Sequence, residues 1–332
     1  MKGLGVLYAA LLLAVYATAT VSAEDAPMQL EAKIPLGNVA GRIDHLAVDL
    51  KRGHVFIAEL GNNTVGVVDV AKRTVVHRIT GLSEPQGVGY LDAQDMLYAA
   101  NAGDGSVHLY RGDDFTERGR IALGSDADNI RFDPKGARLV VGYGSGALSV
   151  IDPATARPVA NHALKAHPES FQIDAKTDRI FVNLPEAHAI AVLERSSGKL
   201  VTQWPMSHAA NFAMALDRDQ PRVFTVFRKP AKLVGFATDS GQVGGQVVGE
   251  VDTCGDVDDL FIDARRQRIY VICGEGFVDV FDARDKLPRL GRVPTVEGAR
   301  TGLFVPDLDR LYVAVRARGR EPAALWVFQP GP

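Results

Sequence analysis

The chain has 332 residues, of which 46% are hydrophobic and 7% aromatic, and its formal net charge is −3. This weakly acidic balance supplies no chain-wide basic surface, so we expect neither nucleic acid nor an anionic membrane as a partner. A mature chain of about 300 residues often forms two domains, but all-β folds of this length are frequently one domain.

The N-terminus has the pattern of a secretory signal peptide. Lys2 is followed by an apolar stretch at 4–19 and by small residues at 21–23. The stretch is shorter than the roughly 20 residues that span a bilayer, and no second hydrophobic segment follows. We therefore expect cleavage of residues 1–23 and one periplasmic or secreted domain, 24–332, without a membrane span. A retained N-terminal anchor is the alternative.

A short apolar run ending in Asp recurs along the chain. The copies end at Asp49, Asp92, Asp133, Asp174, Asp217 and Asp263, and a seventh has Pro306 at that position. The spacings are 41 to 46 residues, and three further strand-like runs follow most copies. Four strands in about 40–45 residues are typical of a propeller blade. The sequence therefore predicts an all-β, seven-bladed β-propeller of four-stranded antiparallel blades.

The seventh blade is one strand short, because the chain ends just after the run at 324–330. Residues 28–36, MQLEAKIPL, have strand composition and precede the first blade. We expect them to form the outer strand of the seventh blade and so close the ring, since a free arm would leave a bare sheet edge.

The runs MLYAAN (96–101), RIYVIC (268–273) and RLYVAV (310–315), with the Gly- or Asn-bearing turns of the repeat, resemble the YVTN repeat of YncE-like bacterial propellers. The resemblance covers essentially the whole mature chain and implies an exported seven-bladed propeller. It says little about activity, because related propellers include streptogramin lyases and lactonase-like proteins that bind a divalent cation. Single-stranded DNA binding, suggested for some YncE-like proteins, is disfavoured by the acidic charge of this chain.

Polar residues recur just before the repeated Asp, where the first strand of each blade begins beside the central channel. The candidate ligand-binding residues at this channel mouth are Arg42, Asp44, His45, Gln86, Asp128, Asn129, His167, Glu169, Asn211, Asp256, Asp258 and Arg300. Crowded carboxylates repel one another and need arginines, a cation or raised pKa values to offset the repulsion. The structural alternative is that such residues bond their own turns or hold water.

Two chemical uses of this mouth follow from the residue types. Oxygen ligands from Asp44, Asp128, Glu169 and Asp258 suit a divalent cation such as calcium, whereas His45 and His167 favour a transition metal. Alternatively, His167 near Glu169, or His45 near Asp44, forms a general base with an orienting acid.

The two cysteines, Cys254 and Cys273, flank strands of the sixth blade. Export permits a disulfide, and no Cys-x-x-Cys motif indicates a redox pair. We expect a structural bridge that closes a loop of about 20 residues and fixes the acidic segment 256–259.

Two functions follow from these expectations. The first is a monomeric, exported scaffold that binds a small ligand or a periplasmic protein through its acidic channel mouth. The alternative is a lyase or lactonase-like hydrolase that uses channel carboxylates and histidines with a divalent cation.

Overall fold

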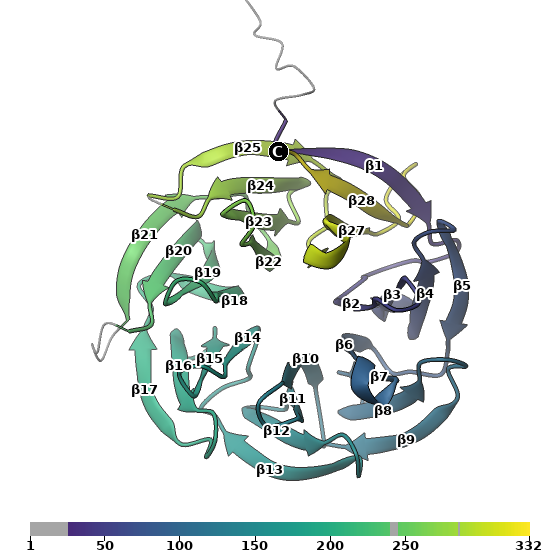
Figure 1. Ribbon diagram of the computed structural model, residues 1–332, viewed down its shortest axis with the longest axis horizontal. Helices are drawn as coiled ribbons and strands as arrows, with labels where there is room; N and C mark the ends of the chain where they lie inside the picture. Colours follow the sequence, from purple (N-terminus) through teal and green to yellow (C-terminus); the bar gives the residue numbers. More distant parts are fainter. Residues whose placement is uncertain (1–25, 240–244, 285) are drawn as a thin grey trace, which may run out of the picture.

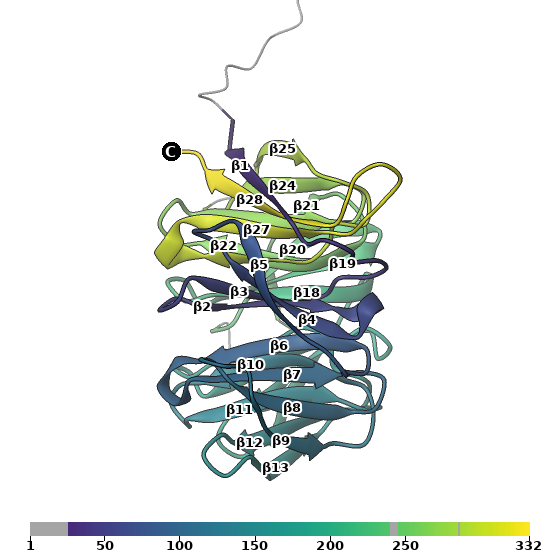
Figure 2. The ribbon, with the colours of Figure 1, turned by 90° about the vertical axis from the view of Figure 1, so that its right-hand side faces the viewer.

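The computed structural model describes residues 26–239, 245–284 and 286–332, so the predicted signal peptide lies outside the described part. The described residues form seven four-stranded antiparallel sheets, arranged as blades around a central axis (Figure 1). Viewed from the side, the ring is a thick disc (Figure 2). The predicted seven-bladed β-propeller is therefore confirmed.

Each blade runs from an inner strand beside the axis to an outer strand at the rim. Blade one consists of β2 (Leu46–Asp49), β3 (His54–Glu59), β4 (Thr64–Asp69) and β5 (Thr74–Ile79). Blade two consists of β6 (Pro85–Leu91), β7 (Met96–Asn101), β8 (Ser106–Arg111) and β9 (Glu117–Ala122). Blade three consists of β10 (Ala127–Asp133), β11 (Arg138–Tyr143), β12 (Ala147–Asp152) and β13 (Arg157–Ala163). Blades four and five consist of β14 (Phe171–Asp174), β15 (Arg179–Leu184), β16 (Ala189–Glu194), β17 (Leu200–Pro205); and β18 (Ala209–Asp217), β19 (Arg222–Lys229), β20 (Ala231–Ala237), β21 (Gln246–Asp252). Blades six and seven consist of β22 (Val257–Asp263), β23 (Arg268–Cys273), β24 (Phe277–Asp282), β25 (Arg289–Pro294); and β26 (Gly302–Val305), β27 (Arg310–Val315), β28 (Ala324–Pro330), β1 (Met28–Pro35).

The ring is closed by the N-terminal strand, as predicted. Strand β1 pairs antiparallel with β28, from Met28 opposite Pro330 to Pro35 opposite Ala324. Figure 1 shows the two strands side by side at the rim, where the beginning and the end of the chain meet. Met28 and Ile34 are buried, so β1 contributes to the core as well as covering the edge of β28.

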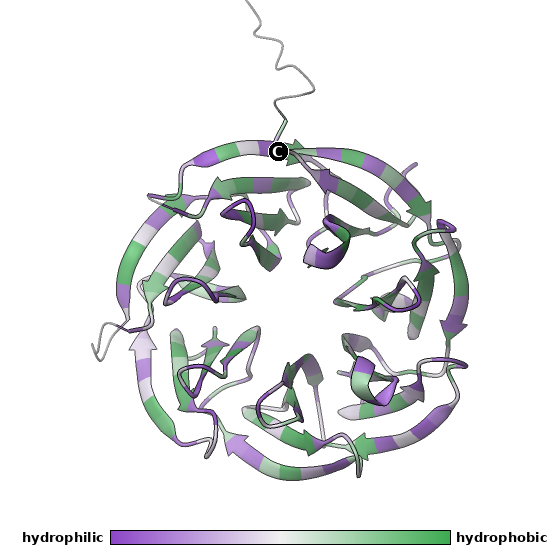
Figure 3. Cartoon of the chain, in the orientation of Figure 1, coloured by the Kyte–Doolittle hydropathy of each residue, from purple (hydrophilic) through white to green (hydrophobic). Residues whose placement is uncertain are grey.

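Apolar side chains fill the space between the blades. Strand β4 is buried along its whole length, whereas only Ile79 of the outer strand β5 is buried. Figure 3 shows the same gradient around the ring, with mainly apolar middle strands and mixed outer strands. Neighbouring blades share their clusters, for example through Phe56 of blade one and Leu97 of blade two. This radial packing buries both faces of each sheet.

The repeated Asp stabilises the turn between the first two strands of a blade. Asp49 accepts a hydrogen bond from the backbone N–H of Arg52 at 3.1 Å, and Asp174 accepts one from that of Lys176 at 3.0 Å. Such Asx turns explain why Asp marks the end of the inner strand. Because these turns lie on one face of the ring, the inner strands all begin on the opposite face. We call the latter the mouth face.

Candidate functional site

A cavity of about 400 Å³ opens at the mouth face, and we call it the acidic mouth. It contains nine of the twelve predicted site residues, namely Arg42, Asp44, His45, Gln86, Asp128, His167, Glu169, Asp258 and Arg300. The other residues that line it are Asp126, Pro185, Glu186, Phe212 and Arg228. The predicted convergence of polar residues from separate blades is therefore present in the structure.

Backbone hydrogen bonds between blades position these side chains. The N–H of His45 in blade one donates to Gln86 of blade two at 3.2 Å. The N–H of Asp259 in blade six donates to Arg300 of blade seven at 3.3 Å. These segments, several of which directly precede an inner strand, are thus tied by backbone hydrogen bonds to the neighbouring blade, which fixes the side chains of the mouth.

Gly87 of β6 explains why blade two contributes no acid at the position of the repeated carboxylates. A Cβ atom at Gly87 would lie 2.0 Å from the backbone carbonyl oxygen of Asp128. Only glycine permits this close approach of β6 to β10. The missing side chain therefore helps to fix Asp128 in blade three.

Two carboxylates of the acidic mouth are already bound by arginines. The Asp44 carboxylate lies 2.7 Å from the Arg42 guanidinium. Asp258 lies 2.5 Å from Arg300 and also bonds Arg228. Burial raises the pKa of Asp258 to about 6, although both arginines act in the opposite direction.

Asp128 and Glu169, unlike Asp44 and Asp258, are bound by no arginine among the described residues. Asp128 is only 5% exposed, its Oδ1 has no hydrogen-bond donor, and its ion pair with His45 Nε2 spans 4.0 Å. Glu169 has no side-chain ion pair or hydrogen bond among the described residues. Burial raises the pKa of Asp128 to about 7, against the attraction of His45 and with added repulsion from Glu169. Burial and repulsion from Asp258 raise the pKa of Glu169 to about 7, against the attraction of Arg228 and His45.

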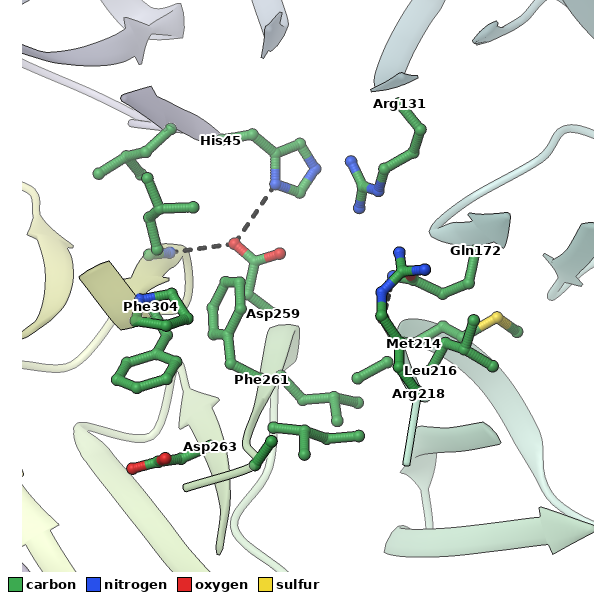
Figure 4. A pocket seen from close by; sticks show the side chains of 18 of the residues that line it. His45, Arg131, Gln172, Met214, Leu216, Arg218, Asp259, Phe261, Asp263 and Phe304 are labelled. Atoms are coloured by element: carbon green, nitrogen blue, oxygen red, sulfur yellow. Dashed lines mark hydrogen bonds and ion pairs between the residues drawn. The ribbon is translucent and has the colours of Figure 1, made fainter. Parts of the chain in front are cut away.

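His45 lies at the inner end of the mouth, between carboxylates of several blades. Its Nδ1 is 3.3 Å from Asp259 Oδ2, and its Nε2 is 3.7 Å from Asp44 Oδ1 (Figure 4 shows the contact with Asp259). Burial lowers the pKa of His45, but Asp259, Asp44 and Asp128 together outweigh burial and raise it to about 10. Near neutral pH the ring is an imidazolium, so His45 supplies a fixed positive charge and is a poor general base.

The predicted pair of His167 and Glu169 is not formed. His167 Nδ1 donates to the backbone carbonyl of Gly144 at 2.6 Å and lies 3.4 Å from Asp126. These partners turn the ring toward the loop between β11 and β12, away from Glu169. The expected general base with Glu169 as its orienting acid is therefore wrong.

Three predicted residues do not line the acidic mouth. Asn211 is fully buried and donates to Asn183 Oδ1 and the Ala189 carbonyl, both at 3.0 Å, so it supports the packing of blades four and five. Asn129 is also buried, and its Oδ1 has no partner. Asp256 accepts a hydrogen bond from Arg300 at 2.9 Å, so it fixes this arginine from outside the cavity.

The arrangement does not support the predicted cation site. In the part of the chain that the structure describes, no three His, Cys, Asp or Glu side chains are placed so as to hold a metal ion. Of the four expected ligands, Asp44 and Asp258 already bond arginines. A carboxylate held by a guanidinium has its negative charge compensated, so only Asp128 and Glu169 stay available, which is too few protein ligands for the roughly six to eight oxygens that calcium takes.

Comparison with known proteins supports the fold alone. No family model matches the chain, and no curated protein matches its sequence. Among solved structures, "Kuenenia stuttgartiensis Hydrazine Synthase" matches with a TM-score of 0.73 and 17% identity, over 90% of this chain and 96% of that one. A chain of "Crystal Structure of Mitotic Checkpoint Complex" matches with a TM-score of 0.77 and 14% identity, over 96% and 98%. The YVTN-repeat resemblance stays a prediction.

The sequence did not single out Arg228, which organises one side of the mouth. It lies near the end of β19, its guanidinium stacks 3.8 Å from the centre of the Phe212 ring, and it bonds Asp258. One sequence signal could have pointed to Arg228. The turn after the second strand of each blade lies on the mouth face, and Arg228 directly follows the aromatic run of the second strand of blade five. Glu186, on the turn after β15, was missed for the same reason.

The predicted disulfide is confirmed. Cys254 and Cys273 are bonded, with Cα atoms 5.7 Å apart, and both side chains are buried. The bridge joins the segment before β22 to the end of β23. It therefore fixes the start of the strand that carries Asp258 and Asp259.

Proposed function

We propose that this chain is an exported β-propeller that binds a small ligand carrying a cationic amine at its acidic mouth. The observation that carries the proposal is the pair Asp128 and Glu169, which line a cavity of about 400 Å³ and are bound by no arginine among the described residues; the one ion pair between them is the long contact of Asp128 with His45, at 4.0 Å. The other two inner carboxylates, Asp44 and Asp258, are bound by arginines.

Physical chemistry favours a cation at this position. Asp128, which is buried, and Glu169, which is half-buried, have pKa values raised to about 7, so each is only partly ionised near neutral pH. An ammonium group that bonds both carboxyls from the cavity would stabilise their ionised forms. The volume falls within the range of pockets for small molecules, roughly 300–1,000 Å³.

Two features support export. The N-terminal segment 1–23 has the pattern of a cleaved signal peptide, and a buried disulfide is typical of oxidising compartments. In the described part of the chain, no helix is long and apolar enough to cross a membrane.

The enzyme alternative receives less support from the geometry. His45 remains protonated near neutral pH, and His167 bonds Gly144 and Asp126 instead of Glu169. Neither histidine is therefore placed as a general base with a carboxylate behind it.

The test is calorimetric binding of putrescine, with 1,4-butanediol as a neutral probe of the same length. We expect putrescine to bind with one-to-one stoichiometry and butanediol not to bind. D128N and E169Q should each weaken binding by about tenfold or more, because each removes a charge-assisted hydrogen bond. The control is E84Q, which changes an exposed carboxylate on the mouth face outside the cavity. Equal binding of both probes, or unchanged binding in D128N and E169Q, would refute the proposal.

A further inference from the structure

A second cavity, of about 520 Å³, lies deeper along the inner strands of the ring, and we call it the deep chamber. His45 lines both cavities, so it marks the boundary between them. The chamber continues along β18, β22 and β26 to the turns that follow these strands, on the face opposite the mouth. Among the described residues, the acidic mouth has carboxylates that no arginine binds, whereas the deep chamber has arginines that no carboxylate binds.

Two arginines reach into the deep chamber without a carboxylate partner. Figure 4 shows Arg131 and Arg218 extending from different blades toward the same open space. Arg131 donates only to the carbonyl of its neighbour Ile130 at 2.8 Å and to Ser170 Oγ at 3.4 Å. Arg218 has no ion pair with any described residue. Burial lowers the pKa of Arg131, but a guanidinium stays charged in proteins.

Four carboxylates also line the chamber, but each is already bound by a cation of the chain. The pairs are Asp217 with Arg222 at 2.6 Å, Asp259 with His45 at 3.3 Å, Asp263 with Arg266 at 3.0 Å and Asp309 with Arg266 at 2.6 Å. Arg265, the third arginine that lines the chamber, also pairs with Asp309 at 3.8 Å. Arg131 and Arg218 are therefore the chamber arginines that have no ion pair with a described residue. A partly buried guanidinium that lacks an anion is costly unless a ligand supplies one.

The rest of the chamber wall is largely apolar. Phe261 and Phe304 form one side in Figure 4, and Met214 and Leu216 form the other. Gln172 is held in place, since its Nε2 donates to the Met214 carbonyl at 2.8 Å. A mainly apolar wall with a few fixed polar groups is the usual make-up of a small-molecule site.

We propose that the deep chamber binds an aromatic or similarly apolar carboxylate, whose anionic group bonds Arg131 while its ring packs against Phe261 and Phe304. The planar guanidinium fits a carboxylate through two parallel hydrogen bonds. Arg218, closer to the opposite face, adds long-range attraction for the anion. This site is separate from the acidic mouth and takes a ligand of opposite charge.

The test measures calorimetric binding of three probes to the mature chain. 2-Naphthoate carries both the ring and the charge, 2-naphthamide carries only the ring, and acetate carries only the charge. We expect saturable one-to-one binding of 2-naphthoate with a Kd below about 1 mM, and at least about tenfold weaker binding of the other two.

Variants locate the binding. R131Q should weaken 2-naphthoate binding by about tenfold or more, and R218Q by a smaller factor because Arg218 is exposed. R118Q, which changes an exposed arginine of the outer strand β9, should bind like the wild type. Melting curves verify that each variant is folded. If R131Q does not fold, the affinity of R218Q for 2-naphthoate decides the test. Equal affinity for naphthoate and naphthamide, no binding of naphthoate, or wild-type affinity in the folded arginine variants would overturn the proposal.

Discussion

The carboxylates of the mouth differ in one respect that decides their chemistry, which is whether a cation of the chain already bonds them. Asp44 and Asp258 are bound by arginines and serve to fix Arg42 and Arg300. Asp128 is bound by no arginine in the described part of the chain, and its ion pair with His45 spans 4.0 Å without a hydrogen bond to Oδ1. A buried carboxyl with so weak a partner is favoured in its protonated form, and its ionisation costs stability.

The variant D128N tests this cost directly. The pKa of Asp128 is about 7 in the folded chain, compared with about 4 for an unfolded chain. The folded state therefore binds more protons between these pH values, and stability falls as the pH rises through this window. We expect D128N to be more stable than the wild type at pH 8, by up to about 4 kcal/mol, and to melt several degrees above it, whereas the two should melt alike at pH 4.

The control for this prediction is E186Q, because Glu186 lines the same cavity but is exposed. Its melting temperature should follow that of the wild type at both pH values. A lower melting temperature for D128N at pH 8 would contradict the prediction, and it would show that the ion pair with His45 outweighs the cost of burying the Asp128 carboxylate.

At the scale of elements, the disulfide fixes the acidic segment of blade six. Cys254 lies just before β22, and its backbone N–H donates to Asp279 Oδ2 at 3.1 Å. The bridge thus adds a covalent link at the place where Asp258 enters the mouth. In the chain-entropy description, a bridge that closes a loop of this length stabilises the fold by ~3 kcal/mol.

We expect the double variant C254A/C273A to unfold at a lower denaturant concentration, with a loss of about 3 kcal/mol that a single measurement of chemical unfolding can quantify. Wild-type protein treated with a reductant should show a similar loss once the buried bridge is opened. An unchanged unfolding midpoint in the double variant would contradict a stabilising role for the bridge.

The strands were predictable from the sequence because their signals are local. The apolar runs, the repeated Asp and its turn all lie within a few residues of one another, so the period of the repeat gives the number of blades. For the acidic mouth, the sequence predicted which residues lie near one another but not which of them bond each other. Which groups bond each other depends on side-chain direction and on neighbours around the ring, as in the contact of His45 with Asp259, 214 residues away. For this reason the sequence suggested a His167–Glu169 pair and a cation site, and it missed Arg228.

At the scale of the whole molecule, the ring depends on β1, which joins the two ends of the chain. Deletion of residues through Leu36 removes the side chains of Met28, Ile34 and Leu36 from the core. Each buried apolar side chain contributes about 1.5–3 kcal/mol, and β28 would become an open edge. We expect this truncated chain to lose several kcal/mol of stability and to aggregate, as measured by melting and light scattering.

A chain that begins at residue 26 is the control, and it should melt as a single stable species. A synthetic peptide of residues 26–37 should restore solubility to the truncated chain by adding the strand in trans. Full stability of the truncated chain without the peptide would show that blade seven does not need its outer strand.

The ring places Asp128 and Glu169 at one cavity, and the most direct test of their role is to measure the protons released when a ligand binds. Putrescine is fully charged at pH 7, so any proton released on binding comes from the protein. Calorimetry in buffers of different ionisation enthalpy should show release of roughly one proton from the wild type at pH 7, and much less from the double variant D128N/E169Q. Binding of putrescine without proton release from the wild type would contradict a mouth built around two partly protonated carboxyls.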